Sequence, residues 1–412
     1  MERLILHSDI NNCYASIEAI RRPELKTVPM AVGGSTSDRH GIILAKNELA
    51  KVFKIKTGEA IWEAKKKCPG LLIIPPNYDL YVDVCEQVRS IYRRYTDQVE
   101  NFGMDECWLD CTGSQRLFGD GLTIARRIAK EIREEIGITV SIGVANNKVF
   151  AKLASDLRKP DAITLAMPDS YETKIFPLPV SELLGVGPAT TRKFNKMGIF
   201  TIGQLARIDL QVLHRLLGKN GVMLGKYARG EGHSVVQGFG SAEKILSIGR
   251  GLTTREDMVS EAAVYSLMKE LAQEVGARLR GEYLLATAVS VSVRDTELFN
   301  REYQTGLGYE THSGSLIAEA GLELFRERYR WERPVRALTI RALRLVDWSE
   351  GRQMSYCSPP GLDKTEQLDL SVEGIRKRFG RNAIFYGNKM KHEFLFSKSD
   401  ARVLMPTGWH SG

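Results

Sequence analysis

Two acidic residues, Asp105 and Glu106, stand side by side in the apolar stretch FGMDECWLD of this 412-residue chain. A β-strand sends neighbouring side chains to opposite faces, so a regular strand would bury one of the two carboxylates. We therefore predict a β-hairpin, entered by residues 99–102 and left by residues 107–110, with both carboxylates at its tip. Two close carboxylates repel and raise each other's pKa. The pair thus predicts a divalent cation, and Mg²⁺ favours carboxylate and phosphate oxygens.

A third carboxylate, Asp9, follows the apolar run that opens the chain in RLILHSD. A chain that leaves a buried strand here presents this side chain at the end of a sheet. Three carboxylates converging from a strand end and a hairpin meet the requirement for two-metal phosphoryl transfer. One ion would lower the pKa of an attacking hydroxyl, and the other would hold a triphosphate and the leaving pyrophosphate. Such acids are also common as solvated features, so that alternative stays open.

The totals describe a globular protein of three or four domains, since a domain typically has about 100–200 residues. The hydrophobic content is 43% and the charged content 26%. We find no apolar run of about 18 residues and no signal peptide, so no membrane segment is expected. The six cysteines form no CxxC pair, which favours reduced thiols in the cytoplasm. The net charge of +8 suggests an acidic partner. We expect the protein to be a monomer.

The chain changes character along its length. Strand and helix patterns are mixed up to about residue 165, which predicts an α+β domain, and residues 26–76 read as an insertion within it. Short helices with glycine turns fill residues 168–237, and the stretch QGFGSAEK after them is a plausible linker. Residues 241–348 read as strand, helix, two strands, helix and strand. Residues 349–412 are partly linker and partly helix.

Three motifs, in this order, resemble those of the Y-family lesion-bypass DNA polymerases: SDINNCYASIEA, GMDECWLD and SIGVANNKVFAKLASDLRKPDAI. The similarity continues through LPVSELLGVGPATTRKFNKMGI and covers about residues 1–348. It implies a bacterial member of the polymerase IV or polymerase V type with a right-hand fold. The implied parts are a palm (1–25 and 77–167), fingers (26–76), a helix-hairpin-helix thumb (168–237), a βαββαβ little finger (241–348) and a C-terminal tail (349–412).

The resemblance also implies roles for single residues. Asp9, Asp105 and Glu106 match the carboxylates that hold two Mg²⁺ ions, with the backbone carbonyl of Ile10 as a further ligand. Tyr14 matches an aromatic steric gate, whose ring would clash with the 2′-hydroxyl of a ribonucleotide. The incoming dNTP would be contacted by Asn12, Cys13, Tyr14, Lys51 and Lys159.

Two positions depart from the family pattern. Asn11 replaces an Asp that is not an essential metal ligand. Glu48 and Lys51 stand where the polymerase IV branch usually has a Tyr and an Arg that touch the triphosphate. Because a carboxylate beside a triphosphate is unfavourable, we expect Glu48 to turn away and Lys51, with Lys46, to provide positive charge. The polymerase V branch also lacks that Tyr, so the branch stays open.

Two further segments suggest contacts with DNA. LLGVGPATTRKF resembles a helix-hairpin-helix, in which Gly185 and Gly187 let backbone N–H groups approach a phosphate and Lys193 follows on the next helix. In the strand VRALTIRALRL, Arg336 and Arg341 would lie across a phosphate backbone. A simple tight turn and a solvated mixed-charge surface are the respective alternatives.

The tail contains QLDLS, in which Gln367, Leu368 and Leu370 resemble the short peptide by which bacterial polymerases dock on the sliding clamp. Ser371 replaces the usual Phe and would lose apolar burial in the clamp pocket. A generic amphipathic linker is the alternative for this segment.

The sequence thus predicts a DNA-directed DNA polymerase of the translesion type, acting on primer-template DNA and dNTPs in damage tolerance. Its small fingers would press weakly on the nascent base pair, which predicts low fidelity. Two alternatives stay open. A nucleotidyl cyclase also has an acidic hairpin in a palm-like domain, but it would not need a helix-hairpin-helix. A DNA-binding accessory protein with a decayed catalytic site is the other.

Overall fold

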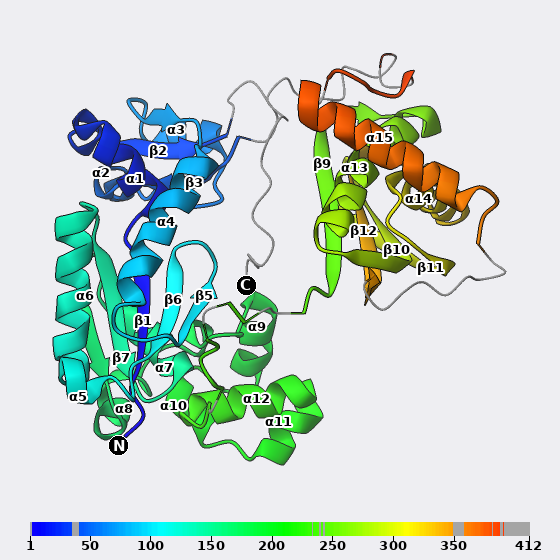
Figure 1. The fold of residues 1–412 in the computed structure, drawn as a ribbon. Helices are drawn as coiled ribbons and strands as arrows, with labels where there is room; N and C mark the ends of the chain where they lie inside the picture. Colours follow the sequence, from blue (N-terminus) through cyan, green and yellow to red (C-terminus); the bar gives the residue numbers. More distant parts are fainter. Residues whose placement is uncertain are drawn as a thin grey trace. The chain divides into compact units, whose positions relative to one another are not determined.

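The computed structural model describes residues 2–34, 41–232, 234–238, 240–241, 244–348, 358–380, 382–387 and 390. These residues form two compact units, a first unit up to residue 241 and a second unit from residue 244 onwards (Figure 1). Within this described part of the chain, no helix is both long enough and apolar enough to cross a membrane.

A five-stranded sheet forms the centre of the first unit, in the order β5-β6-β1-β7-β8. The central strand β1 runs antiparallel to β6 and to β7, and every residue of β1 and β7 is buried. Leu6 packs with the helices α4 and α6, whereas Ile5 packs on the opposite face with α7. The strands are β1 (Ile5–Ile10), β5 (Val99–Phe102), β6 (Glu106–Asp110), β7 (Val140–Ala145) and β8 (Ile163–Ala166).

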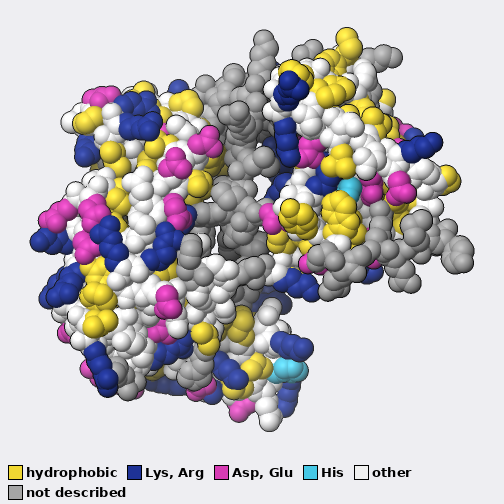
Figure 2. Space-filling model, viewed as in Figure 1, with side chains coloured by type: hydrophobic (Ala, Val, Ile, Leu, Met, Phe, Trp, Pro, Cys, Tyr) yellow, Lys and Arg dark blue, Asp and Glu magenta, His cyan; other side chains and the backbone are white. Residues whose placement is uncertain are grey.

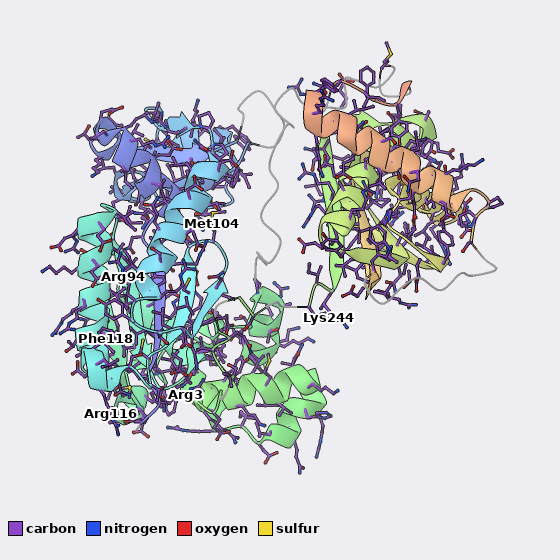
Figure 3. All side chains as sticks on the ribbon, in the orientation of Figure 1. Arg3, Arg94, Met104, Arg116, Phe118 and Lys244 are labelled. Carbon is purple, nitrogen blue, oxygen red and sulfur yellow. The ribbon has the colours of Figure 1, made fainter. Side chains whose placement is uncertain are left out.

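Four helices pack around this sheet: α1 (Cys13–Arg21), α4 (Tyr78–Tyr92), α6 (Gly121–Glu135) and α7 (Lys148–Leu157), with the short α5 (Gln115–Phe118) before α6. The outer surface of α6 mixes basic and acidic side chains (Figure 2). Arg94, labelled in Figure 3, pairs there with Glu131 and Glu135. The basic residues of this face are therefore neutralised locally.

A small three-stranded sheet, β3-β2-β4, stands at one end of the first unit (Figure 1). It consists of β2 (Met30–Gly33), β3 (Ile43–Lys46) and β4 (Leu72–Ile74), with α2 (Glu48–Val52) and α3 (Ile61–Lys67) beside it. Among the described residues, its separate core contains eight buried side chains: Ala31, Ile43, Ala50, Ile55, Ile61, Ala64, Cys68 and Leu71. So small a core gives this part little bulk.

Short helices complete the first unit: α8 (Tyr171–Lys174), α9 (Pro188–Lys196), α10 (Ile202–Ala206), α11 (Leu210–Leu217) and α12 (Lys219–Ala228). Thr201 and Gln204 form a reciprocal capping box at the start of α10. Gly221 lies so close to α11 that a Cβ atom there would stand 2.0 Å from the Leu213 carbonyl oxygen. These helices share a core with α7, in which Phe150 and Phe194 are fully buried.

The second unit has the order of strands and helices that its sequence predicts. It runs β9 (Ser247–Met258), α13 (Glu261–Gly281), β10 (Leu284–Asp295), β11 (Asn300–Thr311), α14 (Gly314–Arg328) and β12 (Val335–Asp347). The strands pair antiparallel in the order β11-β10-β12-β9, and α13 and α14 cover one face of the sheet (Figure 1). Ser260 caps α13 through the Ala263 N–H, as expected from an N-cap serine.

A last helix, α15 (Leu362–Phe379), packs on α14 through buried polar contacts. Asp369 is completely buried, and its carboxylate accepts hydrogen bonds from Ser313 Oγ (2.5 Å), Ser315 Oγ (2.8 Å), Ser315 N (3.1 Å) and Gln273 Nε2 (2.9 Å). Arg280 pairs with Glu373 one turn further on. Helix α15 is therefore an integral part of the second unit.

We predict that Asp369→Ala loosens α15 by about 2 kcal/mol, because several buried donors lose their acceptor. Amide hydrogen exchange along α15 should accelerate, while exchange in the sheet of the second unit stays slow. Asp363→Ala, on the exposed first turn of the same helix, is the matched control and should change exchange little. Equal exchange in both variants would show that Asp369 does not hold the helix.

Candidate active site

The register of the central sheet brings the three predicted acids together. Asp9, the penultimate residue of β1, lies directly opposite Glu106 of β6, and the Ile10 N–H donates to the Asp105 carbonyl oxygen at 3.1 Å. Strands β5 and β6 pair antiparallel, which confirms the predicted hairpin. Its tip is anchored where Arg89 donates to the carbonyl oxygen of Met104, labelled in Figure 3.

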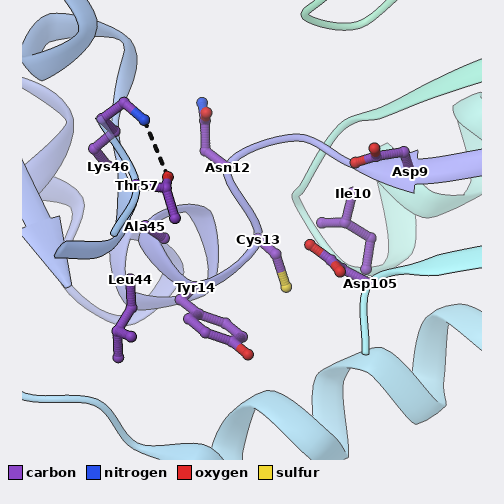
Figure 4. Close-up of a pocket in the computed structure, with 10 residues that line it drawn as sticks. All are labelled: Asp9, Ile10, Asn12, Cys13, Tyr14, Leu44, Ala45, Lys46, Thr57 and Asp105. Atoms are coloured by element: carbon purple, nitrogen blue, oxygen red, sulfur yellow. Dashed lines mark hydrogen bonds between the residues drawn. The ribbon is translucent and has the colours of Figure 1, made fainter. Parts of the chain in front are cut away.

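A pocket of about 290 Å³ opens beside these acids. Figure 4 shows two groups of side chains facing each other across it, acids on one side and a lysine-bearing strand on the other. The acids are Asp9 and Asp105, and the opposite wall contains Lys46, which donates to Thr57 Oγ1 at 3.2 Å. The complete lining is Asp9, Ile10, Asn12, Cys13, Tyr14, Leu44, Ala45, Lys46, Thr57 and Asp105.

Two lysines from the third motif neutralise two of the acids. Lys159 Nζ lies 2.6 Å from Asp9 Oδ2, and Lys152 Nζ lies 2.5 Å from Glu106 Oε2. Asp156 bridges both lysines, at 2.7 Å from Lys159 and 3.6 Å from Lys152. No described Lys or Arg forms an ion pair with Asp105. When all these groups are ionised, the four carboxylates and two ammonium groups sum to −2, the complement of a divalent cation.

The pKa values of the acids follow from these contacts. Burial, together with the charges of Asp9 and Glu106, raises the pKa of Asp105 to about 7. Burial also raises the pKa of Asp9, although Lys159 opposes the shift. Burial opposes ionisation of Glu106 as well, but the hydrogen bond from His7 and the charge of Lys152 outweigh it and lower its pKa to about 2. Asp105 is thus the acid whose ionised form a bound cation would stabilise most.

The donors fit Mg²⁺, which takes hard oxygen ligands. The raised pKa of Asp105 supports this fit, because a bound cation stabilises a buried carboxylate that has no other counter-charge. Among the described residues, however, no three acidic, histidine or cysteine side chains are already gathered as a metal site. Glu106 accepts a hydrogen bond from Lys152 and lies 3.1 Å from His7.

Tyr14 is held in the pocket by two other tyrosines. Its ring stacks on Tyr81 with centroids 4.4 Å apart and planes 12° apart, and Tyr78 meets it edge-on at 5.9 Å. The Tyr81 hydroxyl donates to Glu18 Oε1 at 2.7 Å, which fixes the supporting ring. These contacts restrict rotation of the Tyr14 ring, which lines the pocket between Cys13 and Leu44 (Figure 4).

Of the other predicted nucleotide contacts, two line the pocket and Lys51 does not. Asn12 and Cys13 line the pocket, and Asn12 adopts the left-handed conformation at φ 52° before α1. Lys51 pairs with Glu48, and Glu48 also accepts a hydrogen bond from Asn12, each at 2.8 Å. Glu48 is thus the counter-charge of a lysine in this structure, and it is not among the residues that line the pocket.

The predicted DNA contacts lie on separate elements of the two units. Gly185 has φ +88°, Gly187 precedes α9, and Lys193 is exposed on that helix. On β12, Arg341 is exposed and alternates with the inward Leu338, Ile340 and Ala342, so it shares the helix-free face. Arg336 is the extra residue of a β-bulge opposite β10, so regular alternation does not place its side chain.

The predicted clamp peptide lies within α15. Gln367, Leu368 and Leu370 are exposed on this helix, whereas Asp369 between them is fully buried. The segment is therefore neither a linker nor an extended peptide in this structure. Docking it as an extended strand would require part of α15 to leave the second unit.

Sequence reasoning missed several residues of the site: His7, Thr57, Tyr78, Tyr81, Lys152 and Asp156. Two signals were available. His7 lies two residues before Asp9 and therefore shares its side of the strand. Lys152 and Asp156 have the i, i+4 spacing that places them together on a helix. No comparable pattern in the sequence predicts that Tyr78 and Tyr81 stack on Tyr14. These two residues lie on α4, which follows the small sheet and is distant from Tyr14 in the sequence.

Comparison with known proteins identifies the class. Models of the impB/mucB/samB family match residues 8–156 and, for its C-terminal domain, residues 246–356. A model described as the thumb domain of DNA polymerase-iota matches residues 181–231. Together these models define a nucleic-acid polymerase with a separate C-terminal domain.

Individual relatives agree. The chain is 46% identical to DNA polymerase IV of Acetivibrio thermocellus over 388 residues, covering 94% of this chain and 97% of the relative. It is 33% identical to DNA polymerase IV 1 of Bacillus subtilis over 95% of this chain and 94% of the relative. The chain therefore belongs to the Y family of DNA polymerases and is a DNA-directed DNA polymerase.

Solved structures support the fold. A Y-family DNA polymerase chimera superposes with a TM-score of 0.74 at 22% identity, over 84% of this chain and 99% of the chimera. The structure of DinB from Sulfolobus solfataricus gives 0.54 at 22% identity, over 82% and 98%. Both relatives described above carry the polymerase IV name, whereas the sequence alone left the branch open.

We predict opposite stability effects for the two neighbouring acids in metal-free protein. The folded pKa of Asp105 is above its usual 3.8, so ionised Asp105 destabilises the fold, increasingly as pH rises from about 4 to 7. The folded pKa of Glu106 is below its usual 4.5, so ionised Glu106 stabilises the fold above that pH, and this is lost as pH falls towards 2.

At pH 8 with a chelator, Asp105→Asn should therefore raise the free energy of unfolding by up to about 4 kcal/mol. Glu106→Gln should lower it, because Lys152 and His7 keep only a neutral partner. Thermal unfolding monitored by calorimetry measures both, and the gain from Asp105→Asn should shrink as the pH is lowered towards 4. Changes of the same sign in both variants would contradict the electrostatic assignment.

Proposed function

We propose that this polymerase performs translesion synthesis by two-metal phosphoryl transfer and serves damage tolerance. A primer 3′-hydroxyl attacks the α-phosphate of a dNTP, the bond to the β-phosphate breaks, and pyrophosphate leaves. The proposal is carried by one observation: β1–β6 pairing sets Asp9, Asp105 and Glu106 together beside a pocket that Tyr14 and Lys46 also line.

The residues of the chain have distinct roles in this reaction. Asp9, Asp105 and Glu106 would hold two Mg²⁺ ions together with the Ile10 carbonyl. Bound Mg²⁺ lowers the pKa of the attacking hydroxyl and offsets the charge of the triphosphate and the leaving group. Lys159, which lies beside Asp9, supplies positive charge to the triphosphate. Lys46 and Lys51 supply it from the opposite wall.

The architecture supports the lesion-bypass part of the proposal. We assign the palm to residues 1–25 and 77–167, the fingers to 26–76, the thumb to 168–237 and the little finger to 241–348. The eight-residue core of the fingers leaves little mass to test the shape of a nascent base pair. Gly185, Gly187 and Lys193 would bind DNA phosphates from the thumb, and Arg336 and Arg341 would bind them from the little finger.

The chain also has a candidate docking segment for a partner other than DNA and dNTPs. A sliding clamp would dock at Gln367, Leu368 and Leu370, which are exposed on α15, and docking as an extended strand would require this part of the helix to leave the second unit. The five described cysteines are free thiols, which fits a reducing cytoplasm, and we propose that the protein works as a monomer. Family membership excludes the nucleotidyl cyclase.

Primer extension tests the mechanism. Wild type should extend a primer with Mg²⁺ and dNTPs, on damaged as well as undamaged templates. The double variant Asp105→Ala, Glu106→Ala should lose on the order of a thousandfold in rate, because transition-state charge is no longer neutralised. Equal extension by both proteins would refute the site, and no extension by wild type would favour the catalytically decayed accessory protein.

Sugar selection is a second test. Tyr14→Ala should admit ribonucleotides, because the 2′-hydroxyl no longer meets the ring that Tyr78 and Tyr81 hold in place. Tyr78→Phe is the matched control, since it removes a hydroxyl but keeps the edge-on contact. The measurement is the ratio of kcat/KM for a dNTP to that for the matching rNTP. An unchanged ratio in Tyr14→Ala would remove Tyr14 from the role of steric gate.

A further inference from the structure

Glu48 makes contacts that bind its carboxylate to the wall of the nucleotide pocket. Its Oε1 atom accepts hydrogen bonds from Asn12 Nδ2 and from Lys51 Nζ, each at 2.8 Å. Asn12 itself lines the pocket, next to Asp9 and Tyr14. Although Glu48 is half-exposed, one of its oxygens is thus shared between an amide and an ammonium group.

Two lysines stand close to this carboxylate. Lys46 lines the pocket, and its pKa is lowered by burial and then by the charge of Lys51. The two ammonium groups therefore repel each other in this structure. The ionised carboxylate of Glu48 offsets part of that repulsion, because it attracts both ammonium groups. The charges of Lys51 and Lys46 accordingly lower the pKa of Glu48. Burial works against the ionised form, yet the pKa of Glu48 is lowered by the hydrogen bonds from Lys51 and Asn12.

An oxygen anion held by an amide N–H and an ammonium group, with a second ammonium group nearby, has the surroundings that a phosphate oxygen takes in proteins. Taking the chain to be the dNTP-dependent polymerase proposed above, we propose that Glu48 is an internal competitor for the triphosphate. In the free enzyme it occupies the donors Asn12 and Lys51. An incoming dNTP must displace it, and ground-state affinity for dNTPs is lowered accordingly.

This role explains why a carboxylate is tolerated at this position. Without nucleotide, it satisfies Asn12 Nδ2 and reduces the repulsion between Lys46 and Lys51. With nucleotide, the exposed side chain can swing into solvent, because its other half is already open to water. Glu48 therefore lowers the affinity for the charged part of the substrate, and it takes no part in the bond-making step.

The test is single-nucleotide incorporation by Glu48→Gln and Glu48→Ala. The KM for each dNTP should fall about fivefold with kcat unchanged, the size expected for one partly exposed charge pair. The inhibition constant of inorganic tripolyphosphate, which lacks base and sugar, should fall by a similar factor. Glu63→Gln removes one exposed acid from the neighbouring helix α3 and should leave both constants unchanged. Thermal unfolding verifies that each variant is folded.

The outcomes separate this proposal from the proposed function. If wild type extends primers but both Glu48 variants keep the wild-type KM and tripolyphosphate constant, internal competition is wrong and the polymerase function stands. If KM rises, Glu48 assists nucleotide binding, which also overturns the proposal. If Glu63→Gln matches Glu48→Gln, the effect reflects net charge and the proposal fails again. Should wild type extend no primer, the function fails, and direct binding of tripolyphosphate still decides the role of Glu48.

Discussion

Pairing between β1 and β6 is the constraint on which the site depends, because it places carboxylates closer together than their charges favour. Asp9 and Glu106 are direct partners across the strands, and the chain turns at Asp105. A buried cluster of like charges persists only if something else in the structure offsets it. Lys152 and Lys159 do so in part, and both come from α7 and the residues just after it. The packing of α7 on the sheet is therefore also an electrostatic requirement of the palm.

On both sides of the pocket, charged residues are paired with residues of the opposite charge. On the acidic wall, Lys159 lies beside Asp9 and Lys152 beside Glu106, the carboxylates proposed to bind cations. On the lysine side, Glu48 lies beside Lys51, one of the lysines proposed to bind the triphosphate. Each of these charged groups thus already has a counter-charge within the chain. The consequence is that ligand binding exchanges one set of ion pairs for another.

Sequence reasoning succeeded where a local pattern determines the structure. The hairpin at Asp105 and Glu106 follows from apolar strands that flank a polar tip, and the order of elements in the second unit follows from alternation and helical spacing. Partners across the fold are not encoded locally. Helical spacing predicts that Lys152 and Asp156 share a face, but not that the face meets Glu106.

The same limit applies to Glu48 and to the tail. No local pattern around Glu48 predicts that its carboxylate is shared between Lys51 and Asn12. From sequence alone, the QLDLS segment is interpreted as a clamp-binding peptide or an amphipathic linker, within a tail predicted to be partly linker and partly helix. Its helix is instead fixed by Asp369, whose partners Ser313, Ser315 and Gln273 lie more than fifty residues away in sequence.

Competition by the Glu48 carboxylate would not change the choice between dNTPs. All four dNTPs carry the same triphosphate, so competition by Glu48 weakens the binding of each by the same factor. Such uniform weakening changes the rate at a given dNTP concentration, but it cancels from the ratio of kcat/KM between a correct and an incorrect dNTP. Discrimination between bases must then come from the template and from the fingers, whose small core offers little resistance to a misshapen pair. In these proposals, low fidelity and weak triphosphate binding are independent of each other, located in different residues and separable by mutation.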